Sequence, residues 1–276
     1  MTLTEAVILG VVQGLTEPLP VSSSAHLVIV PTLVPGFQPP GVAFDVLLHL
    51  GTLLAVVFFL RREIGELLAS LMPGKGLAAN MPGTDSGEKA ANRRMVLWIM
   101  IATFLTGVIG ILFKDRIERL FESVETTACM LFITGILLFW SDRMKTKGRR
   151  KGDMNLKDAI ILGLVQAVAL IPGISRSGST ISFGIFRGLE RETAARFSFL
   201  LSIPAISGAA ILKSADLMRL PAGELPVLGA GFLAAAVTGF LSLKLLFAMI
   251  NKTGLAPFAW YCWLFGSATL IIRGLG

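Results

Sequence analysis

The sequence predicts an all-α polytopic membrane protein: an inverted-topology repeat with two re-entrant helix–loop–helix pairs and about six full transmembrane helices. Three observations lead to this fold class. The 276 residues are 54% hydrophobic and only 16% charged, which is typical of membrane proteins and excludes an ordinary soluble domain. Apolar runs of about 20 residues, enough to cross ~30 Å of hydrocarbon, recur along the chain. Finally, the sequence around residues 5–25 recurs around residues 158–178.

The apolar runs fall into two kinds. Two of them, at 5–30 and 158–183, are interrupted by proline, glycine and polar residues, and each predicts a helix pair that enters the membrane and turns back. The others are continuous and separated by polar stretches, among them a charged loop at 114–122. The predicted full spans are 43–60, 95–113, 124–140, 196–212, 225–248 and 255–273.

The repeat organises the chain into one integral membrane domain over residues 1–276. Repeat 1 covers about 1–141 and repeat 2 about 158–276, and a basic linker at 142–157 joins them. Each repeat has one re-entrant pair and three full spans, so it crosses the membrane an odd number of times and the repeats are inverted. In such architectures broken helices meet near the midplane, where irregular backbone must line a cavity or be buried in protein.

Charge orients this topology. The side that carries the loops at 61–94 and 142–157 holds most of the lysine and arginine, so the positive-inside rule places these basic loops in the cytoplasm and both termini outside. Basic loops beside spans also account for the net charge of +7, and we expect no nucleic-acid partner. The sequence does not choose between a monomer and a homodimer.

The first break, residues 13–26, brings polar chemistry to membrane depth, where ionisable groups are costly and by default functional. Glu17 is either a counter-ion for Arg176 that holds the two broken helices together, or a metal ligand or general base. Ser22, Ser23 and Ser24 follow two prolines, and they either cap the next helix or present hydroxyls at a helix start suited to anions. His26 follows Ser23 by three residues, a spacing that permits a nucleophile–base pair. Asp45 and His49, four residues apart, are expected to support the site.

The second break, residues 172–180, has the same design with Arg176 in it. A guanidinium offers a planar fork that matches phosphate oxygens. Gly173 and Gly178 allow close backbone approach to a ligand. Hydroxyl donors surround the arginine: Ser175, Ser177, Ser179 and Thr180. We therefore predict that the two breaks meet and handle the phosphate head of a lipid.

The segments 13–26 and 172–180 resemble the two signature motifs of the undecaprenyl-diphosphatase family, also called bacitracin-resistance proteins, and residues 44–52 resemble it too. The resemblance covers essentially the whole chain. It implies an enzyme of the cell inner membrane that converts undecaprenyl diphosphate, a polyprenyl diphosphate lipid, to the monophosphate carrier of cell-wall assembly, with the site facing the periplasm. It implies catalytic roles for Glu17, Ser23, His26 and Arg176, and substrate binding by the neighbouring polar groups Gln13, Ser22, Ser24, Ser175, Ser177, Gly178, Ser179 and Thr180.

The expected chemistry is hydrolysis of the terminal phosphoanhydride bond. Arg176 holds the terminal phosphoryl group, Glu17 binds a divalent cation (Mg²⁺ or Ca²⁺) that bridges the diphosphate, and Ser23 or a water attacks with His26 as proton acceptor or donor. Gln13 stands where the family also allows a glutamate, so a two-carboxylate metal site is not assumed. The alternative function is a transporter or flippase of polyprenyl-phosphate lipid, since paired midplane breaks also occur in transporters.

Overall fold

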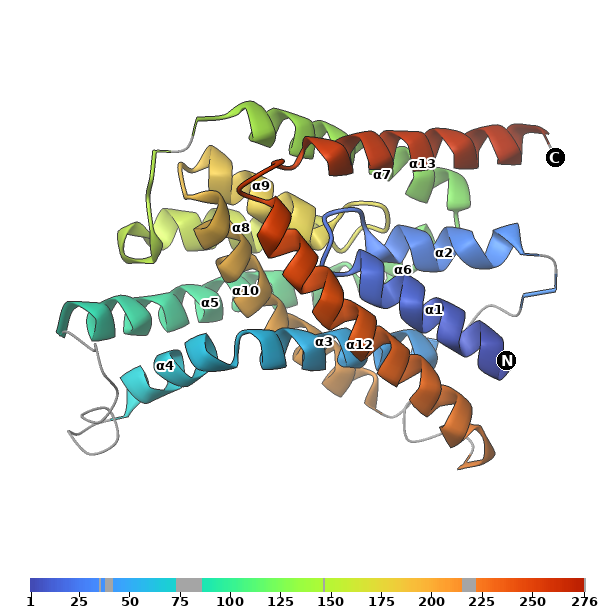
Figure 1. The fold of residues 1–276 in the computed structure, drawn as a ribbon, viewed down its shortest axis with the longest axis horizontal. Helices are drawn as coiled ribbons and strands as arrows, with labels where there is room; N and C mark the ends of the chain where they lie inside the picture. The colour runs from blue at the N-terminus through green and yellow to red at the C-terminus, as the bar shows by residue number, and fades with distance from the viewer. Residues whose placement is uncertain (35, 38–41, 73–85, 146, 215–221, 276) are drawn as a thin grey trace.

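The computed structural model describes residues 1–34, 36–37, 42–72, 86–145, 147–214 and 222–275, and these residues form helices and no extended strand. The α-helices are α1 Leu3–Thr16, α2 Ser23–Leu33, α3 Val42–Phe59, α4 Arg61–Leu71, α5 Ser86–Leu112, α6 Lys114–Leu120, α7 Val124–Arg143, α8 Leu156–Val168, α9 Arg176–Phe186, α10 Arg191–Leu212, α12 Leu225–Met249 and α13 Ala256–Leu275. Two short 3₁₀ turns, Lys151–Asp153 and Ala222–Glu224, complete the described secondary structure. Helices such as α5, α7 and α13 lie along the long axis of the molecule, α10 and α12 cross it obliquely, and both ends of the chain lie at one end (Figure 1).

The predicted multi-pass membrane fold is confirmed. Five described helices, α5, α7, α10, α12 and α13, are long and apolar enough to cross a membrane. The α3–α4 pair, whose helices bend by 75° relative to each other, is a sixth candidate by length and composition, either as a broken span or as a re-entrant loop. The outward surface of these helices is apolar, as a lipid environment requires: Phe104 is 70% exposed on α5 and Leu264 is 69% exposed on α13.

The two interrupted segments are helix hairpins whose halves are too short to span. The α1–α2 pair begins and ends at the end of the molecule where both termini lie, whereas the α8–α9 pair begins and ends at the opposite end, near α4 (Figure 1). Their turns therefore point toward each other at the middle of the bundle. This arrangement fits the re-entrant pairs expected from the sequence.

Helix packing follows a pattern with two matching halves. Helix α1 packs against α12, and α8, which carries the matching sequence, packs against α5. In the same way α3 packs against α12 and α10 against α5. Helices α7 and α13 pack against each other. The residue boundaries of the two repeats stay a prediction.

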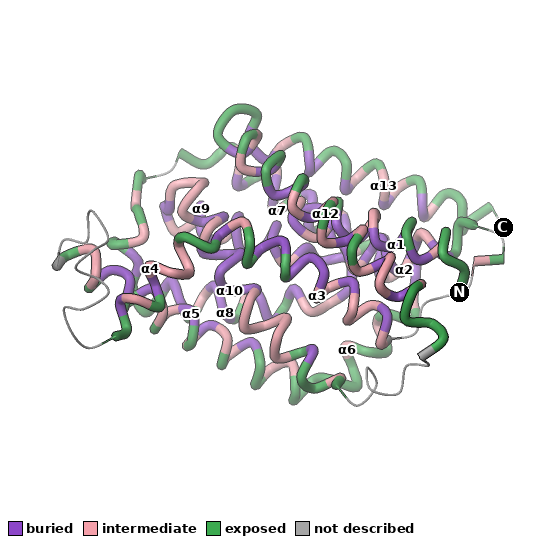
Figure 2. The backbone as a smooth tube through the Cα atoms, turned by 60° about the horizontal axis from the view of Figure 1, so that its bottom comes forward, coloured by how far each residue is buried: buried purple, intermediate pink, exposed green. Residues whose placement is uncertain are grey.

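Buried residues gather around the meeting point of the two hairpins, and exposed residues cover the outer helices and both ends (Figure 2). The main apolar cluster joins Ile181 and Ile185 of α9 with Phe197 of α10.

A helix, α6, occupies part of the charged stretch that we expected to be a loop. All of its residues are partly or fully exposed. The helix therefore has no buried apolar face, and its sequence lacks the hydrophobic periodicity from which a helix is predicted.

Candidate active site

The two helix breaks contact each other through polar groups. Arg176, the first residue of α9, donates from Nη2 to Oε1 of Glu17, which follows the last residue of α1, at 2.7 Å. The backbone N–H of Gly173 donates to Ser24 Oγ at 3.5 Å, and Ser177 Oγ donates to the carbonyl of Leu19 at 3.4 Å. The breaks thus form one cluster, as the sequence indicated.

The first break owes its shape to a strained residue. Helix α1 ends before Pro18 and Pro20, and Ser22 then adopts φ 66°, a left-handed conformation that residues other than glycine rarely take. Ser22 caps α2, because its Oγ accepts from the N–H of Ala25 at 3.4 Å. This conformation starts α2 so that Ser23 faces back toward Glu17.

The second break is held by α7. Gly173 has φ 93°, and a Cβ at this position would collide with the carbonyl oxygen of Thr127. Thr134 Oγ1 donates to the Gly173 carbonyl at 2.9 Å and accepts from the N–H of Ser175 at 3.0 Å. Ser175 in turn caps α9 by accepting from the N–H of Gly178 at 3.0 Å. Glycine is therefore required here by both backbone conformation and space.

Glu17 is the centre of the cluster. Its side chain is only 9% exposed, so its charge needs nearby partners. Arg176 binds Oε1, while Ser23 Oγ donates to Oε2 at 2.5 Å and Gln13 Nε2 donates to the same oxygen at 3.3 Å. The Nε2 of His49 lies 3.7 Å from Oε2. One carboxylate therefore joins a cation, a hydroxyl and an amide.

The structure does not pair Ser23 with His26. The Nδ1 of His26 lies 2.8 Å from the carbonyl oxygen of Ser22, so this nitrogen carries the proton and donates. Its Nε2 then accepts from the hydroxyl of Tyr261 at 2.8 Å. A spacing of three residues on one helix therefore did not bring Ser23 and His26 together. The Ser23 side chain points toward α1, whereas the His26 side chain points toward α13. Ser23 has Glu17, not His26, as its proton acceptor.

Sequence reasoning missed the α13 side of this site. The His26 ring stacks on Phe265 with centroids 4.5 Å apart and an interplanar angle of 2°. Its polar partner Tyr261 is the only tyrosine in the chain and lies within an aromatic, apolar helix. A single polar hydroxyl in an apolar helix could have marked Tyr261 as a candidate site residue. Its position in the sequence, however, gave no reason to pair it with His26.

Asp45 and His49 differ in their relation to the site. His49 bonds through Nδ1 to the backbone carbonyl of Asp45 at 2.8 Å, not to its carboxylate. Its other nitrogen faces Glu17, so His49 contacts the cluster more directly than we expected. The Asp45 carboxylate does not contact Glu17, and its buried Oδ1 has no hydrogen-bond partner among the described residues.

The remaining hydroxyls of the breaks have separate environments. Thr180 Oγ1 donates to the carbonyl of Arg176 at 2.8 Å and lies 2.6 Å from Ser198 Oγ, so it faces α10. The Ser179 hydroxyl is buried without a partner in the described part of the chain. Local pairs are formed by Ser22 with Ser24 at 3.1 Å and by Ser175 with Ser177 at 3.3 Å.

Comparison with known proteins identifies the family. The family model for bacitracin resistance protein BacA matches residues 6–268. The chain belongs to this family.

Curated relatives agree with this assignment. A protein of Syntrophotalea carbinolica named undecaprenyl-diphosphatase is 44% identical, over 96% of this chain and 97% of its own length. Proteins of the same name from Methanosphaera stadtmanae and Geobacter sulfurreducens are each 41% identical, and the matches cover 98% or more of this chain. The family expected from the two motifs is therefore confirmed.

In this BacA-family chain the donor set around Glu17 limits how a cation could bind. No group of three or more histidine, cysteine, aspartate or glutamate residues suited to a metal occurs in the part of the chain that the structure describes. Gln13 is fully buried, and while its Nε2 faces Glu17, its Oε1 has no partner. Because the Gln13 nitrogen and not its oxygen faces Glu17, Glu17 is the side chain here that offers oxygens to a Mg²⁺ or Ca²⁺ ion, whose other ligands would come from phosphates or water.

Proposed function

We propose that this chain is an undecaprenyl-diphosphate phosphatase, which hydrolyses undecaprenyl diphosphate to undecaprenyl phosphate and inorganic phosphate. The name that its relatives share, over nearly their whole length, supports this activity. One observation carries the proposal: Ser23 Oγ lies 2.5 Å from Glu17 Oε2, while Arg176 binds the other carboxylate oxygen at 2.7 Å. This arrangement places a hydroxyl, a proton acceptor and a phosphate-binding cation together.

In the proposed reaction Ser23 Oγ attacks the terminal phosphorus and its proton passes to Glu17. The bond from that phosphorus to the bridging oxygen breaks, and undecaprenyl phosphate leaves. Glu17 passes that proton to the bridging oxygen of the departing undecaprenyl phosphate and becomes a carboxylate again. A water then attacks the phosphoserine and gives its proton to Glu17, which returns it to Ser23 Oγ as the serine–phosphorus bond breaks and inorganic phosphate is released. The hydrogen bond that Ser23 donates to Glu17 favours the serine over a water as the first nucleophile.

Arg176 has donors left for the phosphoryl group. A guanidinium carries five N–H donors, and in this structure Nη2 binds Glu17 while Nη1 donates to the Ser198 carbonyl at 3.2 Å. The side chain is 16% exposed, so it is desolvated where charge develops on the phosphoryl oxygens. Fixed donors in such a setting supply most of phosphoryl-transfer catalysis.

His26 acts as a positioning residue in this proposal. Its two ring nitrogens are occupied by the Ser22 carbonyl and the Tyr261 hydroxyl, so it has no free nitrogen for Ser23. By binding the carbonyl of the strained Ser22, it holds the turn that directs Ser23 toward Glu17. This replaces the proton-transfer role expected from sequence spacing.

A divalent cation, Mg²⁺ or Ca²⁺, would be held by Glu17, and by the Gln13 carbonyl oxygen once that amide turns over, since its nitrogen faces Glu17 in this structure. When bound, it would offset the negative charge of the diphosphate. The unpartnered, buried Gln13 Oε1 supports this proposal. Glu17 keeps lone pairs for such an ion, since a carboxylate offers about four acceptor positions.

We place the enzyme in the cell inner membrane with α4 and the 142–157 linker in the cytoplasm. The side that carries residues 61–94 and 142–157 holds most of the lysine and arginine, which supports this orientation through the positive-inside rule. The α1–α2 hairpin then enters from the periplasmic side (Figure 1). The lipid substrate would reach Glu17 from that side.

The test is phosphate release from undecaprenyl diphosphate by the purified protein in detergent, where no second compartment exists. We expect turnover by the intact protein and a fall of at least about 100-fold in Ser23→Ala, the usual scale for losing a catalytic group. Ser70→Ala, which removes a hydroxyl that bonds to the Leu67 carbonyl within α4, should keep most of the activity. Absence of release from the intact protein with any divalent ion would favour the lipid transporter instead.

A further inference from the structure

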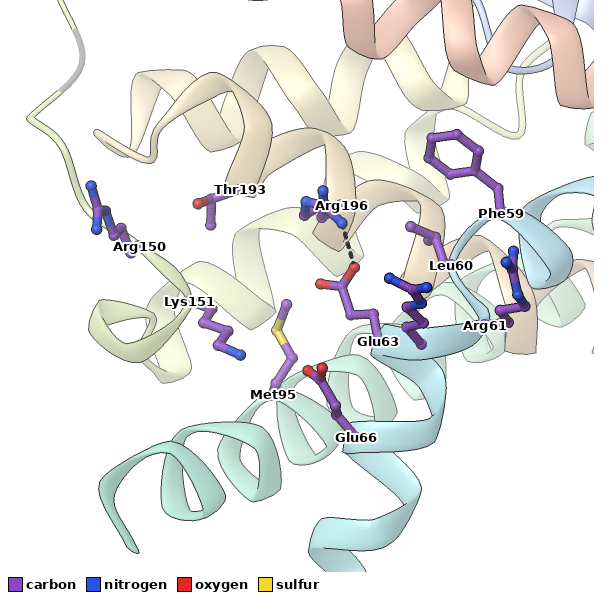
Figure 3. Close-up of a pocket in the computed structure, with 11 residues that line it drawn as sticks. Phe59, Leu60, Arg61, Glu63, Glu66, Met95, Arg150, Lys151, Thr193 and Arg196 are labelled. Atoms are coloured by element: carbon purple, nitrogen blue, oxygen red, sulfur yellow. Dashed lines mark hydrogen bonds and ion pairs between the residues drawn. The ribbon is translucent and has the colours of Figure 1, made fainter. Parts of the chain in front are cut away.

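A second polar pocket lies at the linker end of the molecule, apart from the Glu17 cluster. It has a volume of about 680 Å³ and is formed where α3 bends into α4, together with α5, the linker and the start of α10 (Figure 3). It shares no residue with the Glu17 cluster, and the proposed phosphatase reaction does not use it.

The walls of this pocket are mainly cationic. Five basic side chains line it against two carboxylates, those of Glu63 and Glu66. The basic residues are Arg61, Arg62, Arg150, Lys151 and Arg196.

Three of these cations already have carboxylate partners. Arg196 binds both Glu63 and Glu192 at 2.8 Å. Outside the lining, Arg150 binds Glu190 at 2.9 Å and Lys151 binds Glu88 at 3.1 Å. These pairs fix the walls and supply little net charge.

The two arginines at the start of α4 have no acidic partner among the residues that the structure describes. Arg61 donates only to the backbone carbonyl of Phe58, at 2.9 Å, and its guanidinium lies 4.6 Å from the Phe58 ring centroid. Arg62 has no hydrogen bond or ion pair with any residue that the structure describes. Both side chains are exposed. Two guanidinium forks are therefore available to an anion from outside the chain.

The pocket stands at the edge of the apolar surface. Phe58, beside Arg61, is 54% exposed at the end of the α3 span, while Phe59, Leu60 and Met95 give the pocket an apolar lining. Helix α4 starts here without a side-chain cap, so its first N–H groups add positive potential. A lining that combines apolar side chains with guanidinium groups suits a molecule with a phosphate group and an apolar tail.

We propose that this pocket binds the phosphate group of an anionic ligand, with Arg61 and Arg62 as its principal contacts. Basic pockets between membrane helices are a recurrent way to hold anionic lipid head groups. A lipid phosphate and free inorganic phosphate present the same chemistry to the two guanidiniums. The experiment distinguishes these two sources.

The test measures the thermal unfolding midpoint of the full chain in a neutral detergent during separate titrations with phosphatidylglycerol, phosphatidylcholine and inorganic phosphate. The double variant R61Q/R62Q removes the two free cations. The matched control K114Q/R116Q removes two exposed cations from α6, beyond the other end of α5. We expect phosphatidylglycerol to raise the midpoint of the intact protein more than phosphatidylcholine does, R61Q/R62Q to lose at least half of that difference, and K114Q/R116Q to keep it.

The lipid and phosphate titrations distinguish the two possible ligands. A shift with phosphatidylglycerol but not with inorganic phosphate assigns the site to a lipid, and a shift with inorganic phosphate that also needs Arg61 and Arg62 assigns it to a soluble anion. The proposal is overturned if neither ligand shifts the midpoint, or if the two double variants lose the shift equally, because the effect would then be one of net charge. Phosphate release from undecaprenyl diphosphate is not the readout, so this result is independent of the proposed reaction.

Discussion

Glu17 and Arg176 form an ion pair with a nitrogen–oxygen distance of 2.7 Å although 159 positions separate them in the chain. Each residue lies at the turn of a helix hairpin, and the two hairpins enter from opposite ends of the molecule (Figure 1). An ion pair at this depth loses much of its stabilisation to desolvation. Its position between two polar breaks is better explained by the binding of a phosphate than by stability.

Tyr261 should matter to catalysis through His26 alone. Tyr261→Phe keeps the ring but removes the hydroxyl that donates to His26 Nε2. The buried imidazole nitrogen then has no partner, at a cost of about 1–3 kcal/mol. We expect kcat to fall by up to about tenfold with little change in KM. Trp260→Phe, an adjacent change on the exposed side of α13, should leave kcat unchanged. An equal loss in both variants would contradict the positioning role of His26.

Gly173→Ala tests the shape of the second break. Alanine would have to adopt φ 93° and place its Cβ against the Thr127 carbonyl oxygen, so we expect unfolding to become easier by at least about 2 kcal/mol. Gly107→Ala is the control, because no atom lies within 4 Å of the Cβ it would introduce. The measurement is the thermal unfolding midpoint in detergent. A Gly173→Ala protein as stable as the control would show that the break tolerates another backbone path.

We expect the folded protein to lose stability in acid because of Asp158, which lies at the first turn of α8 beside the linker. Burial alone would raise the pKa of this carboxyl, but hydrogen bonds from Arg149 and Arg187 hold the pKa below its ordinary value of 3.8. Such a group stabilises the fold fully above its ordinary pKa, and this contribution disappears as pH falls through the lowered one.

The corresponding variant is Asp158→Asn, which we expect to lower stability by about 2 kcal/mol near neutral pH. Its difference from the intact protein in unfolding midpoint should stay constant between about pH 5 and 8 and shrink below about pH 4. Asp115→Asn, at an exposed position on α6, is the control. A difference that does not depend on pH down to acid would show that the charge of Asp158 is not the source of its effect.

Hydropathy and repeated polar breaks were enough to predict a multi-pass fold with two hairpins whose breaks meet, and the pairing of Glu17 with Arg176 was one of the two roles considered for Glu17. The reason is physical: in lipid the backbone must bond internally, and a carboxylate and an arginine at the same depth have few partners besides each other. The partner of Ser23 was not predictable in this way. It depends on the positive φ of Ser22 and on which way each side chain of one helix turn points, Ser23 toward Glu17 and His26 toward Tyr261.

The most direct test of the account measures phosphate release from undecaprenyl diphosphate by four forms of the purified protein: intact, Glu17→Gln, Arg176→Ala and the double variant. If both residues act in one site, each single variant loses about 100-fold or more, and the double variant loses little beyond the worse single one, because groups that act as a unit are not additive. Losses that multiply in the double variant, or near-normal release by either folded single variant, would contradict a single site built from the two breaks.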